Sequence, residues 1–372
     1  MRTDLLTCRH NGIQEADLPI MLEKIGVGSV DELIDKTIPT NIRLQEPLPL
    51  AAPMTERQFA EHIADLASQN KLYTSYIGMG WYDAICPAVI QRNVFENPAW
   101  YTSYTPYQAE VSQGRLEALL NFQTAVSDLT AMPLANCSLL DEATAAAEAA
   151  NMMFALRSRD QQKKGANVLF VDENIFPQNL AVIRTRVIPQ GMTILVGDYK
   201  TLEFAPEIFG CIIQYPNSNG SVEDYREFVE KAHAANCKVA VDADILSLAM
   251  LVPPGEWGAD IVFGSTQRLG IPMFYGGPSA AYFATRDEFK RNMPGRIIGL
   301  SKDKYGKLCY RMALQTREQH IKREKATSNI CTAQALMASM VGFYCIYNGK
   351  EGLQRAALNA HTAALTVKAA LE

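Results

Sequence analysis

The feature that most constrains the fold is a series of short apolar segments that alternate with helical segments between residues 168 and 284. Short apolar segments bounded by turn residues are typical of buried strands. We predict strands at residues 168–171, 193–196, 211–214, 238–241, 260–263 and 280–284. The clearest helix between them is predicted at residues 222–235. Because strands separated by helices form a mainly parallel sheet covered on both faces, the pattern predicts an α/β fold.

Further helical patterns precede and follow this series. Residues 114–130 carry leucines at helical spacing, and a second helix is predicted after Ser138. There, Ser138 and Asp141 have the spacing of a capping box, in which two side chains satisfy the first amides of a helix. Residues 332–348 and 351–372 are also predicted to be helical.

Three regions are expected along the chain. Residues 1–70 form an N-terminal arm, with helices predicted at 14–36 and 55–69 and a proline-rich extended strap between them. Residues 71–345 form the large α/β domain, and residues 346–372 begin a small C-terminal domain. The last helical pattern reaches the final residue without a cap or breaker, so we expect this domain to be truncated.

Composition excludes several classes of protein. The 372 residues are 48% hydrophobic and carry a net charge of -5, which argues against a general nucleic-acid binder. No apolar run approaches the roughly 20 residues that span a bilayer, and no signal peptide precedes the arm. The eight cysteines include no Cys-x-x-Cys pair, so neither a metal site nor a disulfide scaffold is expected. The pattern is typical of reduced thiols in the cytoplasm.

Several longer motifs carry a specific resemblance. They are Tyr-Ile-Gly-Met-Gly at 76–80, Glu-Asn-Pro-Ala-Trp-Tyr-Thr at 96–102, Tyr-Thr-Pro-Tyr-Gln at 104–108, Ser-Gln-Gly-Arg-Leu-Glu-Ala-Leu at 112–119, and the segments 138–149 and 317–336. Together they resemble the P-protein (glycine decarboxylase) family of the glycine cleavage system, from about Leu22 onward. The match is to the N-terminal half of the fused form, or to subunit 1 of the split form. The resemblance implies a pyridoxal-phosphate (PLP) transferase fold of the aspartate-aminotransferase type, fold type I.

Gln267 stands where that fold places the lysine that binds PLP as an imine. A carboxamide cannot form an imine with the cofactor aldehyde, whereas an uncharged amine can. The helix that would receive the phosphate begins with Asp141 and Glu142, whose carboxylates would repel it, although acids are also common in first helical turns. We therefore expect no PLP covalently bound to this chain, and the resemblance implies that the other half of the complete enzyme binds pyridoxal 5'-phosphate.

Two residues are candidates for remnants of a cofactor site. Asp242 ends a predicted strand and stands 25 residues before Gln267, about where this fold places the aspartate that faces the pyridine nitrogen. Asn217 lies in an Asn-Pro-x-Asn-like turn of the kind that covers the ring in aminotransferases. Either residue also fits a purely structural role, because strand-end acids and Asn-Gly turns are common.

Two clusters are candidates for this half's share of a pocket. By analogy with homodimers of the fold, Tyr104, Tyr107, Gln108 and Glu110 should face the lysine-bearing half, or pack the interface between halves. The second cluster is Arg317, His320, Ser328 and Asn329. Its cation would suit a substrate carboxylate or a phosphate, while a lone histidine is more often structural.

The chain also departs from the family pattern at two positions. Ile85 and Ser279 stand where many members have histidine. Any role of those histidines in proton transfer or in handling the lipoyl arm is therefore in doubt in this chain.

The resemblance implies glycine dehydrogenase (aminomethyl-transferring) activity, an oxidoreductase function. Glycine is decarboxylated with PLP, and the aminomethyl group passes to the lipoyl arm of H-protein. The implied partners are the C-terminal half or subunit 2 and H-protein, with pairing of two copies of this chain as an alternative. The isolated chain is expected to be inactive.

Two other functions stay open. The chain could be a non-catalytic scaffold that stabilises the catalytic half and docks the lipoyl carrier, or a PLP enzyme with a displaced lysine. A nicotinamide dehydrogenase is disfavoured because no Gly-x-Gly-x-x-Gly follows a predicted strand.

Overall fold

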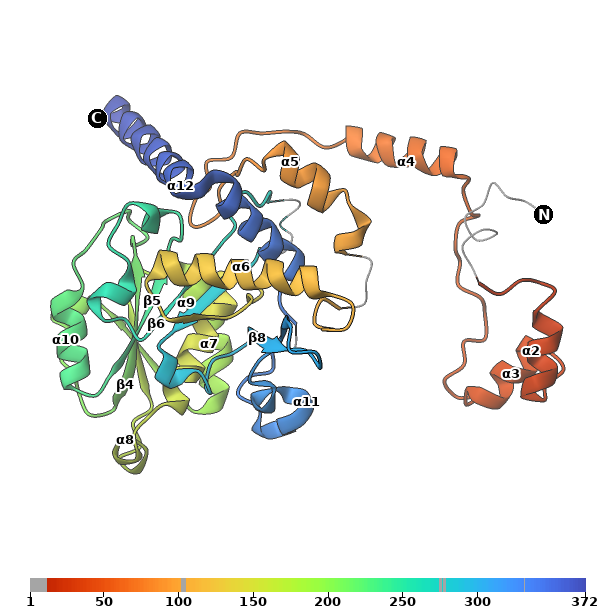
Figure 1. Cartoon of the computed structure of the whole chain (residues 1–372), viewed down its shortest axis with the longest axis horizontal. Coiled ribbons are helices and arrows are strands. Elements are labelled where there is room, and N and C mark those ends of the chain that lie inside the picture. The colour runs from red at the N-terminus through yellow and green to blue at the C-terminus, as the bar shows by residue number, and fades with distance from the viewer. Residues whose placement is uncertain (1–11, 102–104, 274–275, 277–278, 331) are drawn as a thin grey trace. The chain divides into compact units, whose positions relative to one another are not determined.

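The computed structural model describes residues 12–101, 105–273, 276, 279–330 and 332–372. The chain divides after Tyr76 into two compact units (Figure 1). Among its described residues, the first contains three helices, α2 (Leu18–Ile25), α3 (Val30–Thr37) and α4 (Glu56–Ser68), none of which has a buried residue. The single helix predicted at residues 14–36 is wrong, since the backbone of Gly26 ends α2 and Ser29 caps α3.

The second unit is built on a seven-stranded sheet with the order β1-β7-β6-β5-β4-β2-β3. Strands β2 to β6 are parallel to one another, and at one edge β7 pairs antiparallel with β6 and β1 pairs antiparallel with β7. The six predicted strands are confirmed, with bounds extended or shifted by one to three residues. The strands are β1 (Leu134–Ala135), β2 (Val168–Asp172), β3 (Thr193–Gly197), β4 (Ile208–Tyr215), β5 (Lys238–Ala243), β6 (Ile261–Ser265) and β7 (Ala281–Thr285).

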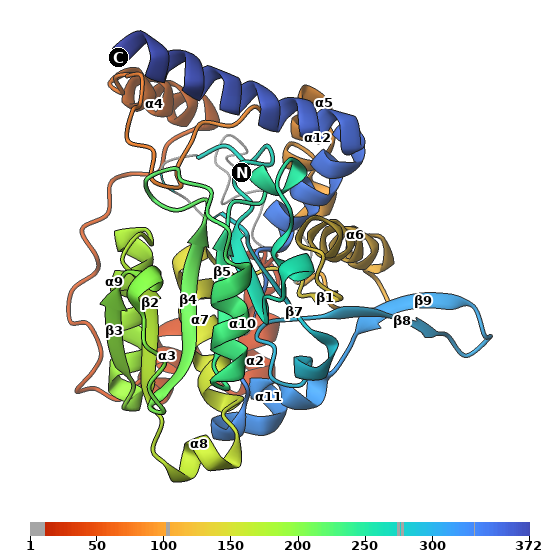
Figure 2. The same cartoon turned by 90° about the vertical axis from the view of Figure 1, so that its left-hand side faces the viewer.

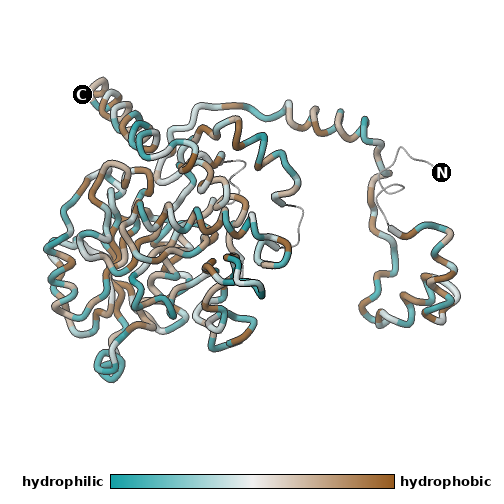
Figure 3. Tube along the Cα trace, in the orientation of Figure 1, coloured by the Kyte–Doolittle hydropathy of each residue, from teal (hydrophilic) through white to brown (hydrophobic). Residues whose placement is uncertain are grey.

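Helices cover both faces of the sheet, as the alternation predicted (Figure 2). Helices α7 (Glu142–Ala155) and α9 (Pro177–Val187) pack on one face, where their buried residues form one core cluster. Helices α6 (Gln113–Thr130), α10 (Arg226–Ala234) and α12 (Ala335–Leu371) contribute to the cluster on the other face. Every residue of β4 is buried, and the apolar stretches of the trace run through the central strands (Figure 3).

Two helix boundaries refine the expectations from sequence. The chain leaves helical geometry inside α12 at Gly349 (φ 61°, ψ -176°), which separates the two helices predicted there. The predicted capping box at Ser138 is wrong. Asp141 caps α7 by accepting a hydrogen bond from Thr144 N at 2.7 Å, while the Ser138 hydroxyl accepts one from Gln334 N.

The remaining elements were not predicted. An antiparallel hairpin of β8 (Ile298–Lys302) and β9 (Leu308–Met312) forms a second sheet, held to α6 by Gln123, whose amide pairs with both backbone groups of Ile298. Short helices are α5 (Ala88–Ile90), α8 (Arg159–Lys163) and α11 (Gln319–Lys322), a π-helix at Gln91–Phe95, and 3-10 helices at Pro98–Trp100, Ile188–Gln190, Tyr199–Thr201, Ser247–Ala249, Pro254–Trp257, Asp287–Phe289, Gln315–Arg317 and Arg323–Lys325. No helix among the described residues is long and apolar enough to cross a membrane.

Gly264 tests the close packing of the central strands. A Cβ atom there would overlap the carbonyl oxygen of Ala243 in β5 and lie 2.9 Å from the Tyr282 ring in β7. Gly264→Ala should therefore lower the free energy of unfolding by about 3 kcal/mol, because overpacking against backbone cannot relax. Chemical denaturation measures this loss. Gly197→Ala is the control, since its Cβ would only touch the Phe170 ring at 3.8 Å; equal losses in the two variants would contradict the account.

Candidate functional site

The carboxyl ends of β5 and β6 and the first turns of α7 and α9 meet at one edge of the sheet. Asp242 is the penultimate residue of β5, and Ser265 is the last residue of β6. Glu142 begins α7, and Asn179 lies in the first turn of α9. Open α/β sheets bind their ligands at this edge, so these side chains define the candidate site.

Asn179 joins two carboxylates in this site. Its side-chain amide donates hydrogen bonds to Glu142 Oε1 and to Asp242 Oδ2, each at 2.7 Å. The other oxygen of Glu142 accepts a hydrogen bond from Ser265 N at 3.1 Å. Asn179 and Asp242 are buried, and Glu142 is half-buried with its carboxylate directed inward to these partners. One neutral amide therefore separates two acids.

The surroundings favour a protonated state for this pair. Burial raises the pKa of Glu142 to about 7, against the lowering effect of the hydrogen bonds from Asn179 and Ser265. Burial and then the Glu142 carboxylate hold the pKa of Asp242 well above its usual range. The pKa of Asp244 is also raised by burial, although its ion pair with Arg268 opposes the rise. The cluster therefore retains a proton near neutral pH.

Gln267 is buried beside this cluster, with only 1% of its surface exposed. Its amide nitrogen donates to the carbonyl oxygen of Ile271 at 2.7 Å and to that of Tyr82 at 2.8 Å. Its backbone N–H donates to the Ser265 hydroxyl at 3.1 Å. Both side-chain N–H groups are thus committed to backbone carbonyls.

These residues do not fit a PLP anchored on this chain. A phosphate needs free backbone amides at a helix N-terminus. Here the Asp141 carboxylate already accepts from Thr144 N, and the Glu142 carboxylate accepts from Ser265 N. Gln267 supplies no amine for an imine. The protein's own acids and amide therefore satisfy the groups that a cofactor would use.

Asn217, the second candidate remnant, is engaged in its own turn. Its side-chain oxygen accepts hydrogen bonds from the backbone amides of Asn219 and Ser221, both at 3.0 Å. This contact favours the structural role that the sequence left open.

The first candidate cluster is split by the structure. Tyr104 lies outside the described residues. The hydroxyl of Tyr107 accepts a hydrogen bond from Ala333 N at 2.7 Å, so it holds the segment that precedes α12. Gln108 and Glu110 are exposed and remain available to a partner surface.

The second cluster lies after the β8–β9 hairpin. The side chain of Arg317 is not among those described. His320 is exposed, with Nδ1 3.6 Å from a carboxylate oxygen of Glu318. Ser328 is half-buried and its hydroxyl accepts a hydrogen bond from Ile330 N at 3.1 Å, whereas Asn329 is exposed.

Arg296 connects the two clusters, and the sequence analysis missed it. It forms an ion pair with Glu318, and its guanidinium carbon lies 5.2 Å from the centroid of the Tyr107 ring. Arg296 and Glu318 are both buried. Asn179 was missed as well. No local motif marks either residue, because their partners lie far away in sequence.

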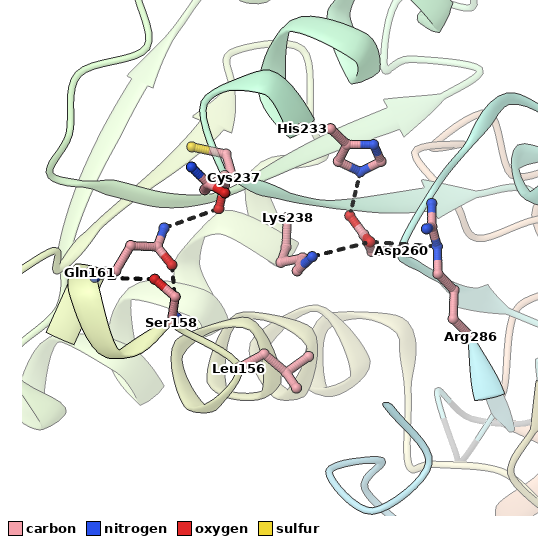
Figure 4. A pocket seen from close by; sticks show the side chains of 9 residues that line it. Leu156, Ser158, Gln161, His233, Cys237, Lys238, Asp260 and Arg286 are labelled. Carbon is pink, nitrogen blue, oxygen red and sulfur yellow. Dashed lines mark hydrogen bonds and ion pairs between the residues drawn. The ribbon is translucent and has the colours of Figure 1, made fainter. Parts of the chain in front are cut away.

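A cavity of about 200 Å³ lies elsewhere in the second unit, at the amino ends of β5 and β6. His233, Lys238 and Arg286 converge there on Asp260 (Figure 4). The buried Asp260 carboxylate also accepts from Val239 N at 2.9 Å. Lys238, Arg286 and the His233 ring are thus engaged with an internal acid that holds two strands together. This edge is opposite to the one where such sheets bind ligands.

The Glu142 pair predicts a pH dependence of stability. A folded-state pKa of about 7 against an unfolded value near 4.5 means that the native state holds this proton more tightly. The resulting stabilisation is complete below pH 4.5 and is lost as pH rises toward 7. The free energy of unfolding of the wild-type chain should therefore fall between pH 4.5 and 7, and Glu142→Gln should make this fall smaller by about 1 to 2 kcal/mol, allowing for partial exposure. Denaturation across this pH range measures it. Glu203→Gln, which changes an exposed acid, is the control and should keep the wild-type pH dependence. An equal dependence of the free energy of unfolding on pH in wild type and Glu142→Gln would contradict the assignment.

Comparison of the sequence with known proteins identifies the family of the chain. The family model described as "Glycine cleavage system P-protein" matches residues 8–372. A glycine dehydrogenase (decarboxylating) of Bacteroides fragilis is 76% identical over 362 residues, which are 97% of this chain and 38% of the relative. One from a Nostoc species is 55% identical over 95% of this chain and 35% of its own length. The chain thus spans less than two fifths of these relatives.

Comparison with solved structures identifies the same family. A crystal structure of glycine decarboxylase (P-protein) of the glycine cleavage system, in inhibitor-bound form, aligns with a TM-score of 0.84 and 34% identity. The alignment covers 93% of this chain and 78% of that one. Glutamate decarboxylase of Lactobacillus brevis aligns with a TM-score of 0.57 at 12% identity, over 88% of this chain and 75% of its own, which supports the fold alone. The chain has the PLP-dependent fold type I and belongs to the glycine cleavage system P-protein family.

Proposed function

We propose that this chain is the N-terminal, lysine-less half of a glycine dehydrogenase (decarboxylating). The complete enzyme decarboxylates glycine and transfers the aminomethyl group to the lipoyl arm of H-protein. The observation that carries the proposal is the buried carboxamide of Gln267, whose two N–H groups are both bonded to backbone carbonyls. The relatives' names and their greater length support it.

The proposal places pyridoxal 5'-phosphate on the other half of the enzyme. In this half, the Asp141 carboxylate takes Thr144 N in the first turn of α7, and the Glu142 carboxylate takes Ser265 N at the end of β6. The partners are then the C-terminal half, or subunit 2, and the lipoyl-bearing H-protein. Location in the cytoplasm stays a prediction.

This half would contribute walls to the active site rather than the group that holds the cofactor. Gln108, Glu110, His320 and Asn329 are exposed and suited to that role. Arg317 and Tyr104 stay candidates from sequence. Glycine has no side chain, so a pocket closed by such groups would exclude larger amino acids sterically.

A second candidate function is a scaffold whose side chains take no part in the chemistry. Two observations favour it in part. The hydroxyl of Tyr107 accepts a hydrogen bond from Ala333 N, and that of Ser328 accepts one from Ile330 N, so these two candidates already have structural partners.

Activity of the chain alone and in the complete enzyme tests the leading proposal. With lipoyl-bearing H-protein supplied as the acceptor of the aminomethyl group, we expect no release of carbon dioxide from glycine by the isolated chain, and release when the lysine-bearing half is also present. Exchange of labelled bicarbonate into glycine measures both. Turnover by the isolated chain, or none after assembly, would overturn the proposal.

Substitution of Glu110 separates the pocket from the scaffold. In the complete enzyme, Glu110→Gln should lower glycine turnover by about 10-fold or more if the carboxylate faces the reacting groups. Assembly is measured in parallel by size-exclusion chromatography, so that a loss of turnover is distinguished from a loss of assembly. Glu203→Gln, an exposed acid that precedes β4, is the matched control. Unchanged turnover in Glu110→Gln would favour the scaffold.

A further inference from the structure

A tight turn at residues 78–82 lies against the candidate site. Three successive residues have positive φ, namely Gly78 (64°), Met79 (54°) and Gly80 (90°). Trp81 N donates to Gly78 O at 3.1 Å and closes the turn. A methionine in left-handed geometry carries a conformational cost and persists only where its surroundings hold it.

Side chains at the candidate site fix the turn from two elements of the fold. From α9, the Gln178 amide donates to Met79 O at 2.8 Å. From the segment after β6, the Gln267 amide donates to Tyr82 O at 2.8 Å, and the Arg268 guanidinium carbon lies 5.0 Å from the centroid of the Tyr82 ring.

The turn also packs closely on the start of α9. A Cβ atom on Gly80 would approach the Phe176 ring to 3.1 Å, so little space separates the turn from this side chain. The hydrogen bonds and this packing together fix the turn relative to the sheet edge.

Glutamine suits this anchoring better than the lysine that the fold would place there. A neutral carboxamide presents two N–H groups, which match the two carbonyl acceptors of Tyr82 and Ile271, while its buried Oε1 has no hydrogen-bond partner among the described residues. A lysine would bring a charge into a position that is 1% exposed, at a cost in desolvation.

The anchored turn presents apolar side chains to the outside. Ile77 is 79% exposed, and Ile85, just beyond the turn, is 89% exposed. Met79, Trp81 and Tyr82 are also exposed by about two fifths of their surface. Such a group of apolar side chains on a held backbone is typical of a docking surface.

We propose that Gln267, with Gln178 and Arg268, is a positioning residue that holds the turn at residues 78–82 in the shape that docks on the lysine-bearing half. The proposal rests on the proposed function, which supplies this occupant. The relatives' length supports the same occupant, since this chain accounts for 38% of the Bacteroides fragilis protein. In this proposal, Gln267, at the position where the fold would place the cofactor lysine, instead fixes the turn at residues 78–82 of the interface.

Hydrogen exchange of residues 77–86 in the assembled enzyme tests the proposal. Gln267→Met removes both N–H donors at similar volume, and loss of a buried hydrogen bond should raise exchange of this segment by about 10-fold. Gln123→Met is the matched control, because Gln123 is also buried and also bonds backbone groups, those of Ile298 in β8. Its exchange at residues 77–86 should equal that of wild type.

A second variant guards against misfolding of the first. Gln178→Ala removes a half-buried side chain and its bond to Met79 O, and it should raise exchange of the same segment. Unchanged exchange at residues 77–86 in both Gln267→Met and Gln178→Ala would overturn the proposal.

The occupant is tested by comparing wild-type chain alone with the assembled enzyme. Residues 77–86 should exchange at least about 10-fold more slowly after assembly with the lysine-bearing half. Equal exchange in the two states, or protection that arises from self-association of this chain, would overturn the assigned occupant. Absence of glycine turnover from an assembly that protects this segment would instead contradict the proposed function.

Discussion

The structure depends on how buried polar groups at the carboxyl ends of β5 and β6 find partners inside the protein. An unpaired buried polar group is costly, and both acids here have a hydrogen-bond partner, whereas the amide oxygens of Asn179 and Gln267 have none among the described residues. The Asn179 amide donates a hydrogen bond to each of the Glu142 and Asp242 carboxylates, and Ser265 N donates one to the other oxygen of Glu142. The pKa of each acid is raised, so the pair retains a proton and avoids two adjacent buried charges.

The sheet edge that binds ligands in related folds is filled here by side chains that belong to the chain itself. Gln267 then connects the filled site to the turn at residues 78–82, because the amide that replaces an amine reaches the Tyr82 carbonyl. Gln267 thus contacts both the buried cluster, through Ser265, and the turn, through Tyr82.

The sequence predicted the elements whose signal is local. The alternation of strands and helices, the helix at Gln113–Thr130 and the break inside α12 all follow from spacing and from glycine. Gln267 stood out through the resemblance. Asn179 could not be found in this way, since its partners lie 37 and 63 residues away. The cap of α7 was misassigned because Ser138 and Asp141 both suit a helix start, and the distant Gln334 N binds the Ser138 hydroxyl.

Borohydride trapping tests the central claim most directly. The assembled enzyme is reduced in the presence of pyridoxal 5'-phosphate, and peptide mass spectrometry locates the pyridoxyl-lysine. The account predicts that every modified lysine belongs to the other half and that this chain, alone or assembled, carries none. A pyridoxyl-lysine within these 372 residues would contradict it.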